Sequence, residues 1–91
     1  MVTKKTAKVP VNDVPSDKYF WMSDGRVLRN LRDLVNALES MDEKIFKHHV
    51  SGKKNDFAAW IKDVFGETKL ATSIAKNKTA SSIAKKIKSA I

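Results

Sequence analysis

Apolar residues recur at helical spacing through much of the chain after residue 19. Between residues 27 and 41 they fall three and four positions apart, which is typical of one face of a helix. Ser23 or Asp24 precedes this run and is a good N-cap, because its side-chain oxygen can accept a hydrogen bond from an unpaired amide. With Ser23 as the cap, Met22 and Val27 take the positions of a hydrophobic staple. We therefore expect a helix that begins after Ser23 and turns its apolar stripe toward the core. The stripe consists of Val27, Leu28, Leu31, Leu34, Val35, Leu38 and Met41.

Two further helices are predicted between residues 40 and 66. Ser40 and Glu43 match the S-x-x-E capping box, so a short helix should follow and run to about Val50. Its inward residues would be Ile45, Phe46, His49 and Val50. After a loop over residues 51–54, Asn55 or Asp56 would cap a third helix, and Gly66 is well placed to end it in the left-handed conformation. The apolar residues of this third helix are Phe57, Trp60, Ile61, Val64 and Phe65.

The last 24 residues predict two more short helices. The first carries Leu70, Ala71, Ile74 and Ala75 and ends near Asn77, and a second starts at Thr79. One face of that final helix holds Ala80, Ile83, Ala84, Ile87 and Ile91. No stretch shows clear strand alternation, although residues 19–22 fit either a short strand or an extended plug into the core. The expected fold is all-α, a compact bundle of three to five short helices.

Charge divides the chain into three parts. The 91 residues carry a formal net charge of +8, but residues 9–66 sum to zero, and the excess lies at the two ends. Blocks of one charge usually mark interaction arms. We therefore expect a flexible, extended basic tail over residues 1–18, a neutral helical domain over residues 19–75, and a lysine-rich, amphipathic helix or tail over residues 76–91.

Length and composition limit the classes of function. A chain of 91 residues allows one small domain and leaves no room for a large enzyme cleft. The absence of cysteine excludes disulfide scaffolds, thiolate zinc sites and thiol catalysis, and it fits the reducing cytoplasm. No apolar run approaches the roughly 20 residues that span a bilayer, and the N-terminus lacks the apolar stretch of a secretory signal. These features predict a cytoplasmic protein.

Several short motifs between residues 19 and 75 together resemble a known family. They are Phe20-Trp21-Met22-Ser23-Asp24-Gly25, Leu28, Asn30-Leu31, Leu34, His49, Asn55-Asp56-Phe57, Trp60-Ile61 and Leu70-Ala71. This signature is similar to that of a family of small, largely archaeal prokaryotic domains of unknown function. The resemblance implies a small helical domain with no assigned reaction or cofactor. It does not cover the basic ends.

His48 and His49 are the one pair that suggests chemistry. Neighbouring residues on a helix point about 100° apart, so they chelate a metal poorly, whereas metal pairs favour the i, i+4 spacing. We expect His49 to face inward and bond a polar group such as Asp56, with His48 exposed. Capping explains the other polar motifs, at Ser23-Asp24-Gly25 and Asn55-Asp56. We therefore predict no catalytic residue, metal, cofactor or small-molecule substrate; an enzyme would need a pocket that gathers His49 with a carboxylate.

The lysine-rich ends suggest the function. A basic amphipathic helix fits nucleic acid, a membrane surface or an acidic protein, and the lack of Trp, Phe and Leu on its apolar face disfavours a membrane. Because lysine is the only cation at both ends, backbone neutralisation is favoured over base readout. We therefore expect a non-enzymatic protein that binds nucleic acid largely without sequence specificity. The residues expected to contact phosphates are Lys4, Lys5, Lys8, Lys76, Lys78, Lys85, Lys86 and Lys88.

Three alternatives remain for these features. The helices flanking residues 76–78 could form a helix-turn-helix, although Lys76, Lys78 and Lys86 would then fall at positions that should be buried. The lysines could instead only solubilise a helix packed on the domain. Finally, the protein could be an interaction module or a subunit of a larger assembly, with a protein partner or a second copy bound at exposed Phe20 and Trp21 or in a groove beside residues 27–41.

Overall fold

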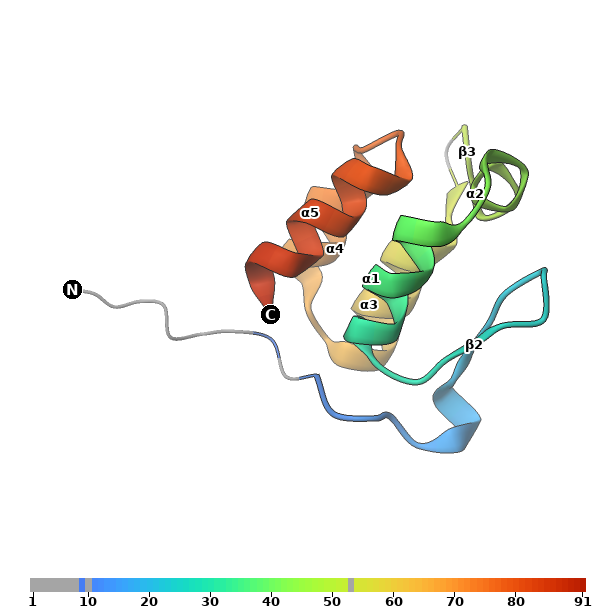
Figure 1. Ribbon diagram of the computed structural model, residues 1–91. Coiled ribbons are helices and arrows are strands. Elements are labelled where there is room, and N and C mark those ends of the chain that lie inside the picture. Colours follow the sequence, from blue (N-terminus) through green and yellow to red (C-terminus); the bar gives the residue numbers. More distant parts are fainter. Residues whose placement is uncertain (1–8, 10, 53) are drawn as a thin grey trace.

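Five helices and two short β-hairpins make up the part of the chain that this computed structural model describes, namely Val9, residues 11–52 and residues 54–91 (Figure 1). The helices are α1 (Leu31–Ser40), α2 (Glu43–His49), α3 (Asp56–Phe65), α4 (Thr68–Ala75) and α5 (Ala80–Ala90). The strands are β1 (Phe20–Trp21), β2 (Val27–Leu28), β3 (Val50–Ser51) and β4 (Lys54–Asn55), and a 3-10 turn, η2 (Ser16–Lys18), precedes them. The predicted compact, mostly helical fold is confirmed, but the two antiparallel hairpins mean that it is not strictly all-α.

The β1–β2 hairpin occupies the region where the sequence predicted the start of a helix. Phe20 pairs with Leu28 and Trp21 with Val27, and Gly25 in the turn has φ +95°. A right-handed helix cannot continue through that conformation, which glycine adopts at little cost. The prediction that a helix begins after Ser23 is therefore wrong.

Helix α1 begins at Leu31 because Asn30 caps it. The Asn30 side-chain oxygen accepts the Asp33 amide hydrogen bond at 2.7 Å. The stripe from Leu31 to Leu38 faces the core as predicted, whereas Val27 and Leu28 belong to β2. Those two residues fit a helix face in the sequence because a strand next to a helix can carry apolar residues at the same spacing.

The other helix boundaries follow local capping. Asp42, and not Ser40, caps α2, with its carboxylate accepting the Ile45 amide at 2.9 Å, so the predicted capping box is wrong. Asn55 caps α3 by accepting the Ala58 amide at 3.0 Å. Of the two predicted caps, Asn55 and Asp56, the structure therefore has Asn55. Gly66 ends α3 at φ +69°, which confirms its predicted role. The expected loop after Val50 is the β3–β4 hairpin.

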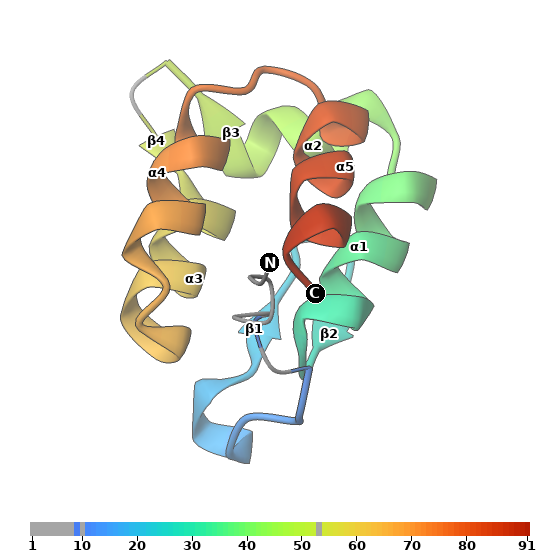
Figure 2. The same cartoon turned by 90° about the vertical axis from the view of Figure 1, so that its left-hand side faces the viewer.

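Helix α5 is a central element of the core. Figure 2 shows it between α4 and α1, and both of those helices contact it. Ile83 and Ile87 are fully buried, as is Ile74 on α4. The predicted amphipathic C-terminal helix is therefore present, but its apolar face completes the bundle instead of forming a separate segment.

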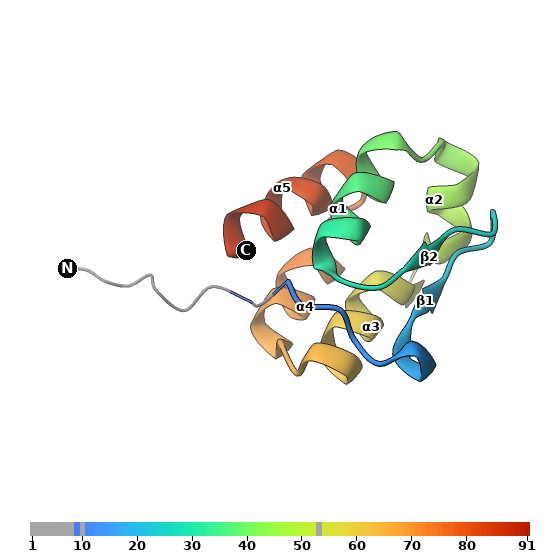
Figure 3. The same ribbon diagram turned by 60° about the horizontal axis from the view of Figure 1, so that its bottom comes forward.

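Part of the expected tail is in contact with the helices. The Val9 amide donates to the Ala90 carbonyl at 2.8 Å, and the Val14 amide donates to the Arg29 carbonyl at 2.8 Å. The Trp60 indole donates to the Lys18 carbonyl at 2.8 Å. Figure 3 shows this segment running from the end of α5 to β1. Residues 1–8, with Lys4, Lys5 and Lys8, lie outside the described residues.

Among the helices of the described residues, none combines the length and the hydropathy needed to span a bilayer.

Candidate functional site

Helices α4 and α5 form an antiparallel helical hairpin (Figure 2). Six exposed lysines lie on the two helices and on the connection between them. Residues 68–91 contain no acidic residue. We call the exposed lysines of α5 and of the connection before it, all five of which the sequence predicted as phosphate contacts, the lysine surface. It consists of Lys76, Lys78, Lys85, Lys86 and Lys88.

The five lysines differ in their contacts. Lys88 forms an ion pair with Glu39 on α1, and the Lys78 amine donates to the Gly52 carbonyl at 3.5 Å. Lys76, Lys85 and Lys86 form no ion pair with any residue that the structure describes. These three ammonium groups are therefore available to an external anion without the loss of an internal pair.

The helix-turn-helix alternative does not match this arrangement. In that register Lys76, Lys78 and Lys86 would occupy buried positions, and all three are exposed. The two helices run antiparallel and present their outer faces side by side (Figure 2). The exposure of these lysines therefore argues against a helix-turn-helix in that register.

A cavity of about 480 Å³ lies at the end of the molecule where three connections meet. Walls come from the α1–α2 connection, the β3–β4 turn and the α4–α5 connection, and Figure 1 shows the last two at the same end. We call it the end cavity; its lining residues are Met41, Asp42, Glu43, Phe46, Lys47, Val50, Ser51, Gly52, Lys78, Thr79 and Ala80. The sequence analysis missed this site, because no local pattern connects three segments so far apart in the chain.

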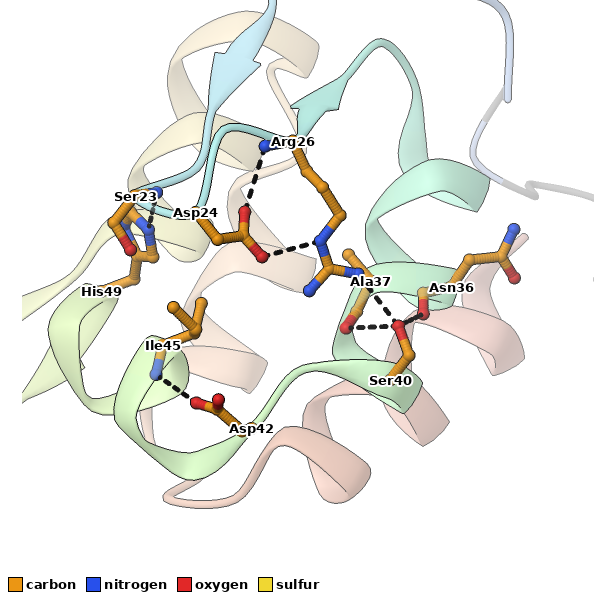
Figure 4. A network of polar contacts seen from close by, with 9 residues as sticks. All are labelled: Ser23, Asp24, Arg26, Asn36, Ala37, Ser40, Asp42, Ile45 and His49. Carbon is orange, nitrogen blue, oxygen red and sulfur yellow. Dashed lines mark hydrogen bonds and ion pairs between the residues drawn. The ribbon is translucent and has the colours of Figure 1, made fainter.

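His49 is buried and hydrogen bonded through both ring nitrogens. Its Nδ1 lies 3.0 Å from Asp56 Oδ2. Its Nε2 accepts the Ser23 amide hydrogen bond at 3.1 Å (Figure 4). These partners assign the neutral tautomer with the proton on Nδ1. The predicted contact with Asp56 and the exposure of His48 are confirmed. His49 therefore joins the β1–β2 turn to α2 and α3.

Arg26 joins the same turn to the end of α1. Its guanidinium donates to Asp24 at 2.9 Å and to the Ser40 hydroxyl at 2.9 Å (Figure 4). The Arg26 backbone amide also donates to Asp24 at 3.0 Å. This amide bond first, and the Arg26 side chain after it, lower the pKa of Asp24 from its ordinary value. The Ser23-Asp24-Gly25 motif thus has a structural role in the turn.

The structure separates the two residues that were predicted to bind a partner. Phe20 is partly buried, with its ring centroid 5.3 Å from that of His49, 5.2 Å from Phe57 and 5.6 Å from Trp60. Trp21 points the other way and is 68% exposed. Only Trp21 can therefore contribute a large free surface to an interface.

A shallow groove of about 260 Å³ lies between β2 and α1. Val27, which pairs with Trp21 across the hairpin, forms part of its wall. Most of the residues that line it are polar, namely Arg26, Arg29, Asp33, Asn36 and Ser40. The hydrogen bond and charge of Asp33 raise the pKa of Arg29, which stays a cation. This groove lies where the sequence analysis placed one, beside residues 27–41.

No cluster of three or more histidine, aspartate or glutamate side chains suited to a metal ion occurs in the described ranges 11–52 and 54–91. A comparison of the chain with protein families, with curated proteins and with solved structures finds no match. The resemblance of residues 19–75 to a small archaeal domain family therefore stays a prediction.

Proposed function

We propose that this protein is a non-enzymatic nucleic-acid-binding protein that grips phosphates through its lysine surface. The observation that supports this most directly is the acid-free helical hairpin α4–α5, which exposes lysines on its outer face while Ile83 and Ile87 hold it in the core. Lys4, Lys5 and Lys8 are proposed as a second basic arm and lie outside the described residues.

The chemistry of the lysine surface favours contacts with the backbone over contacts with bases. A lysine ammonium is a compact point charge that binds a phosphate from many directions, whereas bidentate reading of guanine is typical of arginine. Residues 68–91 hold no arginine. Because α5 is already folded, binding does not require its backbone to be ordered first.

A salt titration tests this proposal. We expect the full-length protein to bind labelled DNA or RNA at low salt, with log affinity falling by about 0.9 per log unit of salt for each duplex phosphate neutralised. Replacing Lys76, Lys85 and Lys86 with glutamine should weaken binding and reduce that slope. Deleting residues 76–91 would be a poor test, because it removes Ile83 and Ile87 from the core.

The matched control replaces Lys18, Lys44 and Lys62 with glutamine. These lysines are also exposed, lie on other elements, and carry the same total charge. Fluorescence polarisation measures the affinity of both variants. An equal loss in the control variant would show that only net charge matters, and absence of binding at low salt would refute the proposal.

A second candidate function is a protein-interaction module that uses Trp21. Tryptophan and arginine are enriched among the residues that dominate binding at protein interfaces. Trp21 is exposed and pairs across the hairpin with Val27, which lines the groove that contains Arg26 and Arg29. Sedimentation and copurification of the wild type and of Trp21→Ala test this candidate. A wild type that is strictly monomeric and carries no copurifying protein would count against it.

A further inference from the structure

We propose that the end cavity receives one unstacked base of a single-stranded nucleic acid whose phosphates follow the lysine surface. This inference rests on the proposed function and specifies its substrate class. Three observations carry it: the cavity adjoins the lysine surface, its floor is apolar, and its charged rim has no net charge.

The cavity and the lysine surface share a residue. Lys78 belongs to the lysine surface and also lines the end cavity. Its amine reaches across the mouth to the Gly52 carbonyl, at 3.5 Å, so the α4–α5 connection and the β3–β4 turn face each other there. Lys76 lies two positions earlier in the same connection. A strand bound along the hairpin thus passes the mouth of the cavity.

The interior of the cavity suits a flat, uncharged ring. Met41, Phe46, Val50 and Ala80 supply its apolar part. Phe46 is only 6% exposed, so its ring is held in place by the core and cannot swing out to solvent. The volume of about 480 Å³ is within the range of roughly 300–1,000 Å³ that is usual for pockets holding small organic ligands.

The charges at the rim argue against a phosphate inside the cavity. Two acids, Asp42 and Glu43, stand beside two bases, Lys47 and Lys78. Asp42 accepts the Ile45 amide at 2.9 Å, and Glu43 lies 3.3 Å from the Lys47 amine. A neutral rim fits the neutral base of a nucleotide, whereas the adjoining lysines fit its anionic phosphate. This match of charges along one nucleotide selects nucleic acid as the occupant.

A duplex cannot supply that base without losing a stacked pair, which costs free energy. A single strand presents bases that are already unpaired, so one of them can enter the apolar cavity without that cost. The geometry therefore predicts that single strands bind more tightly than duplexes of the same sequence.

The test fills the cavity from an exposed position. Ser51 lines the cavity but is exposed on β3, so Ser51→Leu introduces a larger aliphatic side chain there without replacing a core residue. Ala80→Leu fills the same space from the opposite wall and serves as the second variant should the first fold poorly. Ala59→Leu is the matched control, since Ala59 is exposed on α3 and does not line the cavity.

Fluorescence polarisation compares a labelled 12-nucleotide single strand with its duplex at one low salt concentration. We expect the wild type to bind the single strand about tenfold more tightly than the duplex, because only the single strand inserts a base without breaking a stacked pair. Ser51→Leu should remove that difference and leave the duplex affinity unchanged, and Ala59→Leu should retain it.

Two results would overturn this inference and leave the proposed function standing. One is a wild type that binds duplex as tightly as single strand. The other is a folded Ser51→Leu protein whose affinity for the single strand equals that of the wild type. Absence of binding to either ligand at low salt would instead refute the proposed function, so the two failures are distinguishable.

Discussion

Replacing Ile87 with alanine tests whether α5 is part of the core. Ile87 is 0% exposed and lies on the face of α5 that contacts α1 and α4. Removing three buried carbon atoms from such a site typically costs about 2–5 kcal/mol, because the lost burial is added to the cost of a cavity. A domain of 91 residues has a total stability of about 5–14 kcal/mol, so this single change should remove a large part of it.

Urea denaturation followed by circular dichroism measures this loss. The control is Lys85→Ala, two positions earlier in the same helix, where the side chain is exposed and the expected change is within about 0.5 kcal/mol. The slope of the transition should stay constant in both variants if they unfold in two states. An Ile87→Ala protein that loses less than about 1 kcal/mol would refute the packing of α5 described above.

Three further changes test the local structure. Asn55→Ala removes the side-chain oxygen that caps α3 by accepting the Ala58 amide, and it removes a 3.3 Å hydrogen bond to the Ile74 carbonyl. Thermal unfolding should therefore show a loss of about 1–3 kcal/mol in the free energy of unfolding. Gly66→Ala forces a side chain into the left-handed region at φ +69° and should cost about 1 kcal/mol in the same assay, although no atom obstructs the new methyl group. Asp24→Asn tests the pH dependence of stability. Folding lowers the pKa of Asp24 below its ordinary value of 3.8, so the ionised carboxylate stabilises the fold at pH values above 3.8. The stability advantage of the wild type over this variant, measured by urea midpoints, should therefore shrink as the pH falls through the lowered pKa.

The helical part of the fold was predictable where local chemistry is unambiguous. In α3 the apolar spacing, the Asn55 cap and the Gly66 stop all indicate one helix, and the structure has it between those residues. The inward position of His49 followed from the same periodicity. Its contact with Asp56 was predictable because the two residues border adjacent helices.

The β1–β2 hairpin was not predictable from periodicity. Its strands have two residues each, too short to show alternation, and Val27 and Leu28 also continue the α1 stripe in the sequence. The available signals were Gly25 and Asn30, since a glycine turn followed by a strong cap marks the true start of the helix. The capping box at Ser40 was misleading because Asp42, two residues later, is the better placed acceptor.

Of the two main candidate sites, the lysine surface was predictable from the sequence and the end cavity was not. The exposure of Lys76, Lys85 and Lys86 was predictable, because charged residues on an amphipathic helix face solvent. The end cavity was not, because it depends on how three connections pack. The composition pointed to the positive charge of α5. Its buried residues at positions 83, 84 and 87 show that α5 is also part of the hydrophobic core.

The hydrogen bond from Val9 to Ala90 brings the two ends of the described fold side by side. A chain whose ends meet can be closed with a short linker and reopened elsewhere, which is why such domains tolerate circular permutation and insertion into a host protein. Gly25, exposed in the turn between β1 and β2, offers one place for new termini. The helices should therefore keep the same packing when the chain is permuted so that they follow one another in a different order. The domain could also be inserted into a larger protein, because both of its connections would leave from one place on its surface.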